Sequence, residues 1–274
     1  MSENGKTAAL IDKAAAGDAK AMEELIREIE DDVFNMSLRM LGGFEDAQDA
    51  SQEILIKVIS GLADFKKQST FSTWVFRVAV NHLKNYRRHM FAQRPLSFEM
   101  YGEDILNANT DVPDMTGSAD RALLAEELKM SCTNVMLQCL DAEARCIFIL
   151  GTMFAPDSRI AGEILGITPE AYRQRLSRAR KRMAEFLSEY CGEYGNGKCR
   201  CKDRVNYAVT CHRINPQKRD FTEQTLKEVK RAMEDLDELS DSFEFMKTYK
   251  SPERMRKFVK EFISSEQLIK VTEA

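Results

Sequence analysis

Side chains that can read or hold DNA recur along one predicted helix in the second half of the chain. Its outward-facing residues are Arg173, Gln174, Ser177, Arg178 and Lys181, and Arg175 belongs to the same basic run. Arg and Gln early in such a helix can make paired hydrogen bonds to base edges in the major groove, and later Arg and Lys residues would meet phosphates. The pattern predicts DNA recognition; the alternative is a helical hairpin with a solvated basic face.

The segment before this helix supplies the elements that would hold it against DNA. Residues 158–165 predict a short first helix, Gly166 a tight turn, and Ile167 an apolar plug between the two helices. Thr168 is a suitable N-cap, with Pro169 at the first helical position. Together these signals predict a helix-turn-helix whose second helix enters the major groove.

A second group with chemical potential lies in a Gly-rich stretch, where Cys191, Cys199, Cys201 and Cys211 are joined by His212. Four thiolates could hold a tetrahedral zinc ion. The spacing matches no standard zinc finger, because a Cys-x-Cys step replaces the usual two-residue gap. Free thiols or a redox pair are the alternatives, and the neighbouring cations would favour thiol reactivity. We expect no cofactor to be required.

Three further cysteines, Cys132, Cys139 and Cys146, are spaced by sevens. On one helix they recur on the same face, with successive residues about 10 Å apart along the axis, so the three cannot share one metal ion. We expect them to act as small buried hydrophobic residues.

The composition of the 274-residue chain limits its class. Hydrophobic residues make up 43% and charged residues 31%, as in soluble globular proteins. Thirteen Gly and six Pro are few for the many turns of an all-β fold, so we predict an all-α fold. No run approaches the roughly 20 apolar residues of a membrane span. The first residues also lack the apolar core of a secretory signal, so we expect a cytoplasmic protein without membrane insertion.

The net charge is only −4, which argues against a uniformly basic nucleic-acid binder. The charges are nevertheless segregated along the chain. Residues 22–53 and 99–127 are mainly acidic, whereas residues 77–94 and 173–182 are basic. Two basic patches separated by an acidic connector indicate two docking points on one polyanion.

Apolar periodicity and turn residues divide the chain into segments. Helices are predicted over 8–40, with a break at Gly17, over 46–59, and from about residue 70 to Arg88. We predict two small helical domains joined by an acidic linker and followed by a helical C-terminal extension. The predicted boundaries are 7–90 for the first domain, 91–118 for the linker, 119–188 for the second domain, 189–220 for a Cys-rich segment and 221–274 for a helical tail.

Two motifs resemble those of bacterial RNA polymerase sigma factors. Residues 46–58, 71–81 and 86–88, together with Phe65, resemble region 2 of that family. The stretch that runs from residues 140–143 to 165–167 and continues at 175–180 resembles region 4, which carries the family's helix-turn-helix. The resemblance covers about residues 7–188 in the family's order, and the short linker resembles the extracytoplasmic-function group.

Three residues depart from the family pattern. Arg159 stands where an acid is usual, and Pro169 and Tyr172 stand where small or β-branched residues are common. These departures concern the details of the promoter sequence and not the class.

The resemblance implies a sigma factor that binds core RNA polymerase, recognises promoter DNA and promotes strand opening, with an anti-sigma factor as a further partner. The polymerase-binding residues would be Asp46, Asp49, Gln52 and Glu53. The residues at the minus-ten element would be Phe65, Lys66, Lys67, Arg77, Asn81, Lys84 and Arg88. The residues at the minus-thirty-five element would be Arg173, Gln174, Arg175, Ser177, Arg178 and Lys181.

Other classes explain less of the sequence. A stand-alone helix-turn-helix regulator would leave the region-2 motif unexplained. A thiol oxidoreductase or metalloenzyme at the cysteines would lack a paired acid or base at a recognisable spacing, so we expect no enzymatic activity. We also expect the acidic linker to be a flexible tether. The extension from Cys191 onward is expected to regulate the two domains and not to build them, because both motifs are complete by about Ser188.

Overall fold

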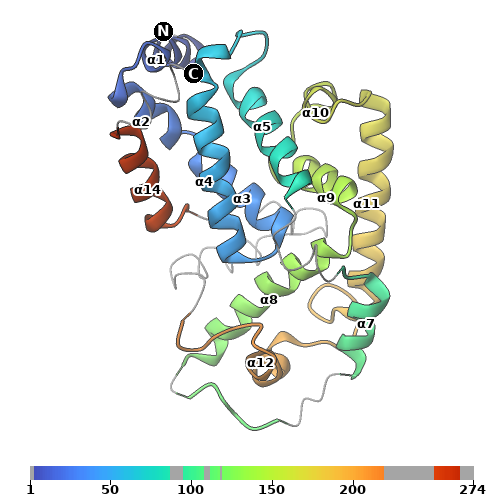
Figure 1. Ribbon diagram of the computed structural model, residues 1–274. Helices are drawn as coiled ribbons and strands as arrows, with labels where there is room; N and C mark the ends of the chain where they lie inside the picture. Colours follow the sequence, from blue (N-terminus) through green and yellow to red (C-terminus); the bar gives the residue numbers. More distant parts are fainter. Residues whose placement is uncertain (1–2, 87–94, 108–111, 118, 219–249, 266–274) are drawn as a thin grey trace.

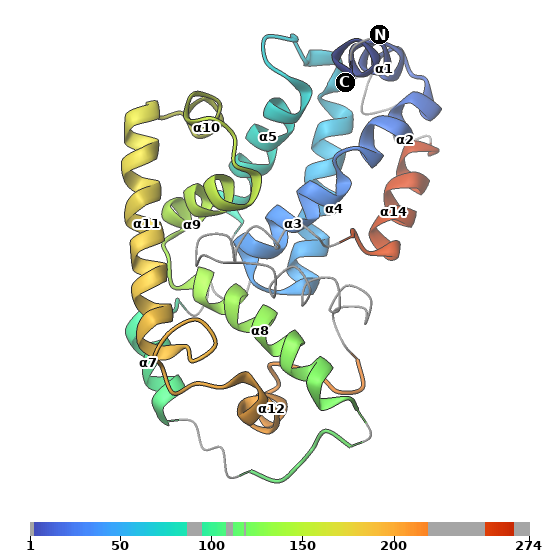
Figure 2. The same ribbon diagram turned by 180° about the vertical axis from the view of Figure 1, so that it is seen from behind.

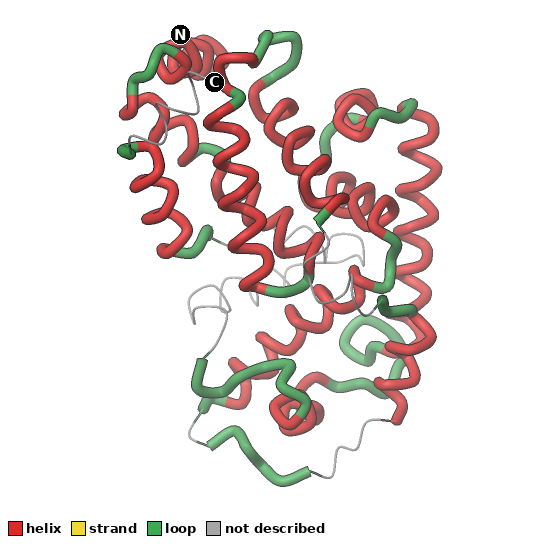
Figure 3. The backbone as a smooth tube through the Cα atoms, in the orientation of Figure 1, coloured by secondary structure: helices red, strands yellow, loops and turns green. Residues whose placement is uncertain are grey.

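The computed structural model describes residues 3–86, 95–107, 112–117, 119–218 and 250–265, and the regular secondary structure of these ranges is helical (Figures 1 and 3). The all-α prediction is therefore confirmed. The first helical unit comprises α1 (Glu3–Ala15), α2 (Ala19–Arg27), α3 (Glu30–Leu41), α4 (Phe44–Ser60) and α5 (Phe71–Asn85). The second helical unit comprises α8 (Arg121–Gln138), α9 (Ala142–Ile149), α10 (Ser158–Leu165) and α11 (Pro169–Tyr190). The remaining helices are α7 (Phe98–Asn107), α12 (Cys201–Thr210) and α14 (Glu253–Ile263).

The structure corrects two expected elements. The helix predicted over 8–40 is three helices, because the chain turns at Ile29 as well as at Gly17, whose φ of 91° suits glycine. The acidic linker contains a helix, α7, which apolar periodicity did not reveal. Its Tyr101 is buried and stacks on Phe186 of α11 at a ring-centroid distance of 5.4 Å. Tertiary packing, and not local propensity, accounts for this helix.

The core of the first helical unit is built by α2, α3, α4 and α5. Leu25, Phe34, Ile54 and Leu55 are completely buried there. Gly42, with a φ of 77°, closes α3 in the left-handed conformation and lets α4 return along it. The long polar face of α4 is thereby left on the outside of the unit.

Side-chain caps begin each helix of the second helical unit. Asp120, Asp141, Asp157 and Thr168 each accept a hydrogen bond from a backbone N–H in the first turn of α8, α9, α10 and α11 respectively. In Figure 2, α9 and α10 lie beside α11. The caps at Asp157 and Thr168 therefore set where the two helices of the helix-turn-helix begin.

The two helical units are packed directly against each other. Helix α5 of the first lies beside α9 and α10 of the second (Figure 1). The rings of Phe76 and Phe154 meet with centroids 4.7 Å apart, and one buried apolar cluster continues through both units. The described helices on either side of the linker thus share a core.

Two buried arginines cross this contact. Arg145, 7% exposed, donates to the carbonyl oxygens of Met40 at 2.6 Å, Leu137 at 2.9 Å, Leu140 at 2.8 Å and Gln138 at 3.2 Å. Burial lowers the pKa of Arg145 to about 10, so the group remains charged at neutral pH.

Arg39 makes the reciprocal contact from the first unit. It is completely buried and donates to the side-chain oxygen of Asn134 on α8. Gln138 in turn donates to the Arg39 carbonyl at 3.1 Å. Both units therefore depend on each other for hydrogen bonds to buried polar groups.

The C-terminal extension is part of the fold. Val205 and Ala208 of α12 are buried against Leu124 and Leu128 of α8. This differs from the expectation that the extension does not build the domains: without α12, the outer apolar face of α8 would be exposed.

The last described helix, α14, packs on α2 and α4. Its Met255, Val259 and Ile263 are buried. Just before it, the Ser251 amide donates to Asp31 at 2.7 Å and the Lys250 ammonium lies 2.9 Å from the same carboxylate. Residues 250–265 are thereby attached to the first helical unit.

Replacing Arg145 by Ala should strongly destabilise the protein. Each buried carbonyl left without a partner costs about 1–3 kcal/mol, so we expect the free energy of unfolding to fall by at least about 3 kcal/mol. Urea denaturation followed by circular dichroism measures this. Arg159→Ala, which removes an exposed guanidinium from α10, is the matched control and should change stability by less than about 0.5 kcal/mol. Equal losses in the two variants would contradict this account.

Candidate nucleic-acid and polymerase interfaces

The helix-turn-helix has the predicted geometry. Gly166 ends α10 with a φ of 70°, and Thr168 caps α11 by accepting from the Ala171 amide at 3.2 Å. A Cβ atom added at Gly162 would lie 2.6 Å from the carbonyl oxygen of Ile167, so the turn approaches α10 too closely for a larger residue. Tyr172 is buried beneath the turn. The orientation of α11 relative to α10 is thus fixed by packing.

The exposed face of α11 carries most of the predicted DNA-binding residues. Arg173, Gln174, Ser177, Arg178 and Lys181 are all exposed. Arg173 also donates to the Ser158 hydroxyl at 2.8 Å and forms an ion pair with Glu170 at 3.1 Å. These contacts hold its guanidinium near the start of the helix.

Arg175 lies apart from that face. It is half-buried and forms an ion pair with Glu143 of α9. Arg175, although part of the basic run, is therefore turned toward α9, and helical periodicity could have separated it from its neighbours.

The predicted polymerase-binding residues lie along α4. Asp49 is exposed, and Asp46, Gln52 and Glu53 are half-buried. Glu53 lies 3.3 Å from the His82 ring of α5. The carboxylates form an acidic face whose position is set by the buried Ala50, Ile54 and Val58 on the other side of α4.

The predicted minus-ten residues on α5 do not form one open face. Asn81 is exposed, but Lys84 is half-buried. Arg77 forms an ion pair with Glu163 of α10 at 2.5 Å. Arg88 lies outside the described residues. The second helical unit therefore covers part of the surface on which sequence periodicity placed a DNA contact.

The loop before α5 is folded around aromatic side chains. The Phe65 ring lies 5.1 Å from Trp74 and 5.9 Å from Phe71, centroid to centroid. Lys67, with a φ of 55°, pairs with Asp12 of α1, whereas Lys66 is exposed. Trp74 is half-buried in this aromatic group.

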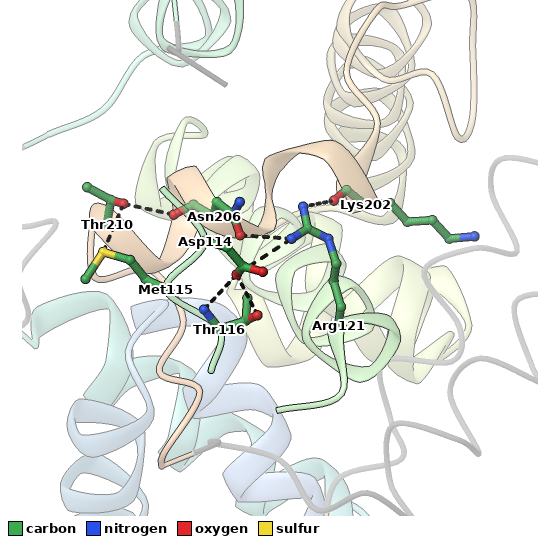
Figure 4. A network of polar contacts seen from close by, with 7 residues as sticks. All are labelled: Asp114, Met115, Thr116, Arg121, Lys202, Asn206 and Thr210. Carbon is green, nitrogen blue, oxygen red and sulfur yellow. Dashed lines mark hydrogen bonds and ion pairs between the residues drawn. The ribbon is translucent and has the colours of Figure 1, made fainter. Parts of the chain in front are cut away.

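The acidic linker is attached to the extension, as Figure 4 shows. Arg121 of α8 donates to the Asn206 side chain at 2.9 Å and to the Lys202 carbonyl at 3.2 Å, and lies 3.9 Å from Asp114. Asp114 also accepts from the Thr116 amide and hydroxyl at 2.9 and 2.7 Å. The expected tether is therefore held in place over residues 112–117, a contact that only the fold could reveal.

The candidate metal ligands are divided between two places. Cys211 is exposed at the C-terminal end of α12, and Cys201 is buried at its start. A cavity of about 30 Å³ brings together Cys199, Cys201 and Cys132 of α8. Within the described ranges, however, no three or more His, Cys, Asp or Glu residues are arranged to hold a metal ion. The zinc site stays a prediction.

Burial disfavours the thiolate form of the three cysteines that are spaced by sevens. It raises the pKa of Cys132 to about 11 and those of Cys139 and Cys146 to about 12. Cys139 and Cys146 are buried as expected. Cys132 differs, because the Tyr101 hydroxyl donates to its sulfur at 3.0 Å and the cavity beside it contains two further thiols.

Comparison with known proteins gives the class. Residues 25–90 match the model of sigma-70 region 2. The chain is 25% identical over 182 residues to the RNA polymerase sigma-H factor of Pseudomonas aeruginosa. The aligned segment covers 65% of this chain and 92% of that protein. It is 24% identical to the extracytoplasmic-function sigma factor SigW of Bacillus subtilis, over 65% of this chain and 95% of the relative. It is 30% identical to the sigma-E factor of Haemophilus influenzae, over 47% of this chain and 68% of the relative.

A helix-turn-helix preceded by a region-2 fold defines a transcription initiation factor. The chain belongs to the extracytoplasmic-function sigma factors of RNA polymerase. Its role is in transcription initiation, and its family is not an enzyme class. None of the helices in the described ranges is long and apolar enough to cross a membrane.

The exposed face of α11 leads to a prediction about DNA reading. In holoenzyme assembled with core polymerase, Arg173→Ala or Gln174→Ala should change the preference at particular upstream bases by about 1–3 kcal/mol, the worth of a good bidentate contact. Arg178→Ala should instead weaken all sequences alike and reduce the salt slope by about one unit. Binding titrations on promoter variants at several salt concentrations measure both effects.

Arg175→Ala is the matched control, because its guanidinium is engaged by Glu143. It should change DNA binding less than Arg178→Ala does. A uniform loss across all sequences in Arg173→Ala would show that the start of α11 does not read bases.

Proposed function

We propose that this sigma factor works through three surfaces. The acidic face of α4 binds the polymerase clamp, α5 with the loop before it binds the minus-ten element, and the exposed face of α11 binds the minus-thirty-five element. Family membership supports the three roles, and the exposure of Asp49, Asn81 and Arg178 supports these positions. We take residues 7–90 and 119–188 as the two functional domains.

The role of α4 follows from its charge. Carboxylates on an exposed helical face complement a basic partner and steer association, fixing register more than adding affinity. Asp49 and Glu53 lie one helical turn apart, so they present charge along one line of the helix. Such a line suits docking against a helical partner such as the clamp.

The role proposed for the loop before α5 follows from the free energy needed to separate the strands of the promoter DNA. A base flipped out of the duplex loses a few kcal/mol of stacking, so a protein that holds the open strand must offer stacking and hydrogen-bonding groups. The aromatic group of Phe65, Phe71 and Trp74 lies at the start of α5, and the exposed Lys66 lies in the loop just before it. We propose that this end of α5 receives the opened strand.

The two DNA-binding units are in direct contact, and this contact is the main support for the proposal. Arg77 of α5 is paired with Glu163 of α10, and Phe76 packs on Phe154 just before α10. The minus-ten and minus-thirty-five elements are about 25 base pairs apart, or about 85 Å at 3.4 Å per pair. Units in direct contact cannot span that distance. We therefore propose that the described arrangement is a closed form that opens on the promoter.

The extension fits a regulatory role in this closed form. Helix α14 lies on α2 and α4, the helix that carries the proposed clamp-binding face, and α12 covers α8, which holds Asn134 against Arg39. We propose that the extension adjusts the balance between closed and open forms. We further propose a cytoplasmic location and, as in the family, an anti-sigma factor as a regulatory partner.

Reversing charge on α4 tests the polymerase-binding role. Asp49→Lys with Glu53→Lys should weaken binding to core polymerase by at least about tenfold, mainly through the association rate, because steering would be lost. A fluorescence titration and stopped-flow association measure this. The control is Glu24→Lys with Glu28→Lys, which makes the same change in net charge at exposed positions of the α2 region. Equal binding by both double variants would refute the assignment.

Weakening the contact between the units tests the closed form. Phe154→Ala with Glu163→Arg removes a ring contact and sets two cations together, at a cost to the closed form of about 1–2 kcal/mol. Hydrogen exchange in peptides from α5 and α10 should then quicken, and holoenzyme should form faster. Arg159→Ala, on the same helix, should change neither. Unchanged exchange in the double variant would mean that these contacts do not hold the units together.

A further inference from the structure

Cys191 and Cys199 are paired across a short backbone ladder at the end of α11. The Cys199 amide donates to the Tyr190 carbonyl at 3.2 Å, and the Gly192 amide donates to the Cys199 carbonyl at 2.9 Å, which makes a parallel β-bridge between the two cysteines. Neighbouring extended segments lie about 4.8 Å apart. Disulfides form at Cα separations of about 4.4–6.8 Å. The backbone therefore already holds these two residues at a disulfide's spacing.

The loop between them is held in shape by close packing. The Gly197 amide donates to the Cys191 carbonyl at 3.3 Å, and the Arg200 guanidinium donates to the Gly197 carbonyl at 2.9 Å. A Cβ atom added at Gly197 would lie 2.0 Å from the carbonyl carbon of Tyr190. The loop is closed by contacts that do not involve the sulfurs, so it is pre-arranged in the thiol form.

The surroundings of this pair differ from those of the buried thiols. Cys191 and Cys199 are both half-exposed, whereas Cys139 and Cys146 are buried. Burial raises the pKa of the Cys199 thiol, and the guanidinium groups of Arg204 and Arg200 only partly oppose this rise, so the expected activation by neighbouring cations is not dominant. Partial exposure, together with the spacing held by the backbone, lets an oxidant reach this pair of thiols.

We propose that small peroxides oxidise Cys191 and Cys199 to a reversible disulfide that closes the loop between them. In a reducing compartment such a bond is transient, as in redox-sensing proteins. The proposal concerns the extension alone and does not depend on the roles assigned to α4, α5 and α11.

The chemistry balances with one peroxide per disulfide. The Cys199 thiolate attacks a peroxide oxygen; a sulfur–oxygen bond forms, the oxygen–oxygen bond breaks, and one water leaves after protonation. The Cys191 thiolate then attacks the resulting sulfenic sulfur; the sulfur–sulfur bond forms and a second water leaves. Two thiols are oxidised and the peroxide is reduced to two waters. A thiol reductant reverses the bond by exchange.

The test uses full-length reduced protein treated with hydrogen peroxide. Intact mass should fall by two hydrogens, and non-reducing peptide mapping should find Cys191 joined to Cys199; dithiothreitol should restore the original mass. Cys199→Ser and Cys191→Ser should each abolish the change. Cys211→Ser, at an exposed thiol outside the pair, and Cys132→Ser, at the neighbouring cavity, should keep it. Circular dichroism confirms that each variant is folded.

Three results would overturn the proposal. One is a principal disulfide that joins Cys132 or Cys201 to another thiol. Another is oxidation confined to Cys211. The third is one zinc per chain in protein purified without chelator, lost in Cys199→Ser, because a metal clip would then occupy these sulfurs. Loss of the mass change in both Cys191→Ser and Cys199→Ser, with its retention in Cys211→Ser, would support the disulfide.

Discussion

The arrangement of the molecule depends on the burial of Arg145 between its two helical units. Taking a guanidinium out of water is costly unless its donors are satisfied, and this one is satisfied by carbonyl oxygens from α3 and from the α8–α9 region. Met40 contributes its oxygen from the first unit. The units therefore cannot separate without exposing or hydrating this cation. In the proposed closed form, this polar contact acts together with the apolar cluster that continues through both units.

Helix α8 connects that contact to the C-terminal extension. One of its faces presents Asn134 to the buried Arg39, and another packs under α12 through Leu124 and Leu128. Cys132, between these faces, accepts from Tyr101 of α7. Helix α8 thus contacts both the extension and the first helical unit.

The DNA-reading faces illustrate how tertiary contacts select among sequence candidates. Periodicity along α11 correctly predicted that Arg178 is exposed, whereas Tyr172 and Met183 of the same helix are buried. It could not show that Arg175 pairs with Glu143, or that Arg77 pairs with Glu163, because each partner lies on another helix. The Cys-x-Cys spacing predicted a cysteine site within the extension. In the fold, Cys132 of α8 lies at the same cavity as Cys199, and Cys211 lies outside that cavity and is exposed.

The sequence by itself determined the helical class, the helix-turn-helix and the family. These rest on local signals: a cap at Thr168, a left-handed turn at Gly166 and an apolar period of 3.6. Helix α7, the docking of α12 on α8 and the contact of α5 with α10 were decided by tertiary structure alone. Tyr101, Val205 and Phe76 stabilise these contacts by packing against residues that are distant in the sequence. Because such packing depends on the whole fold, no local sequence pattern predicts it.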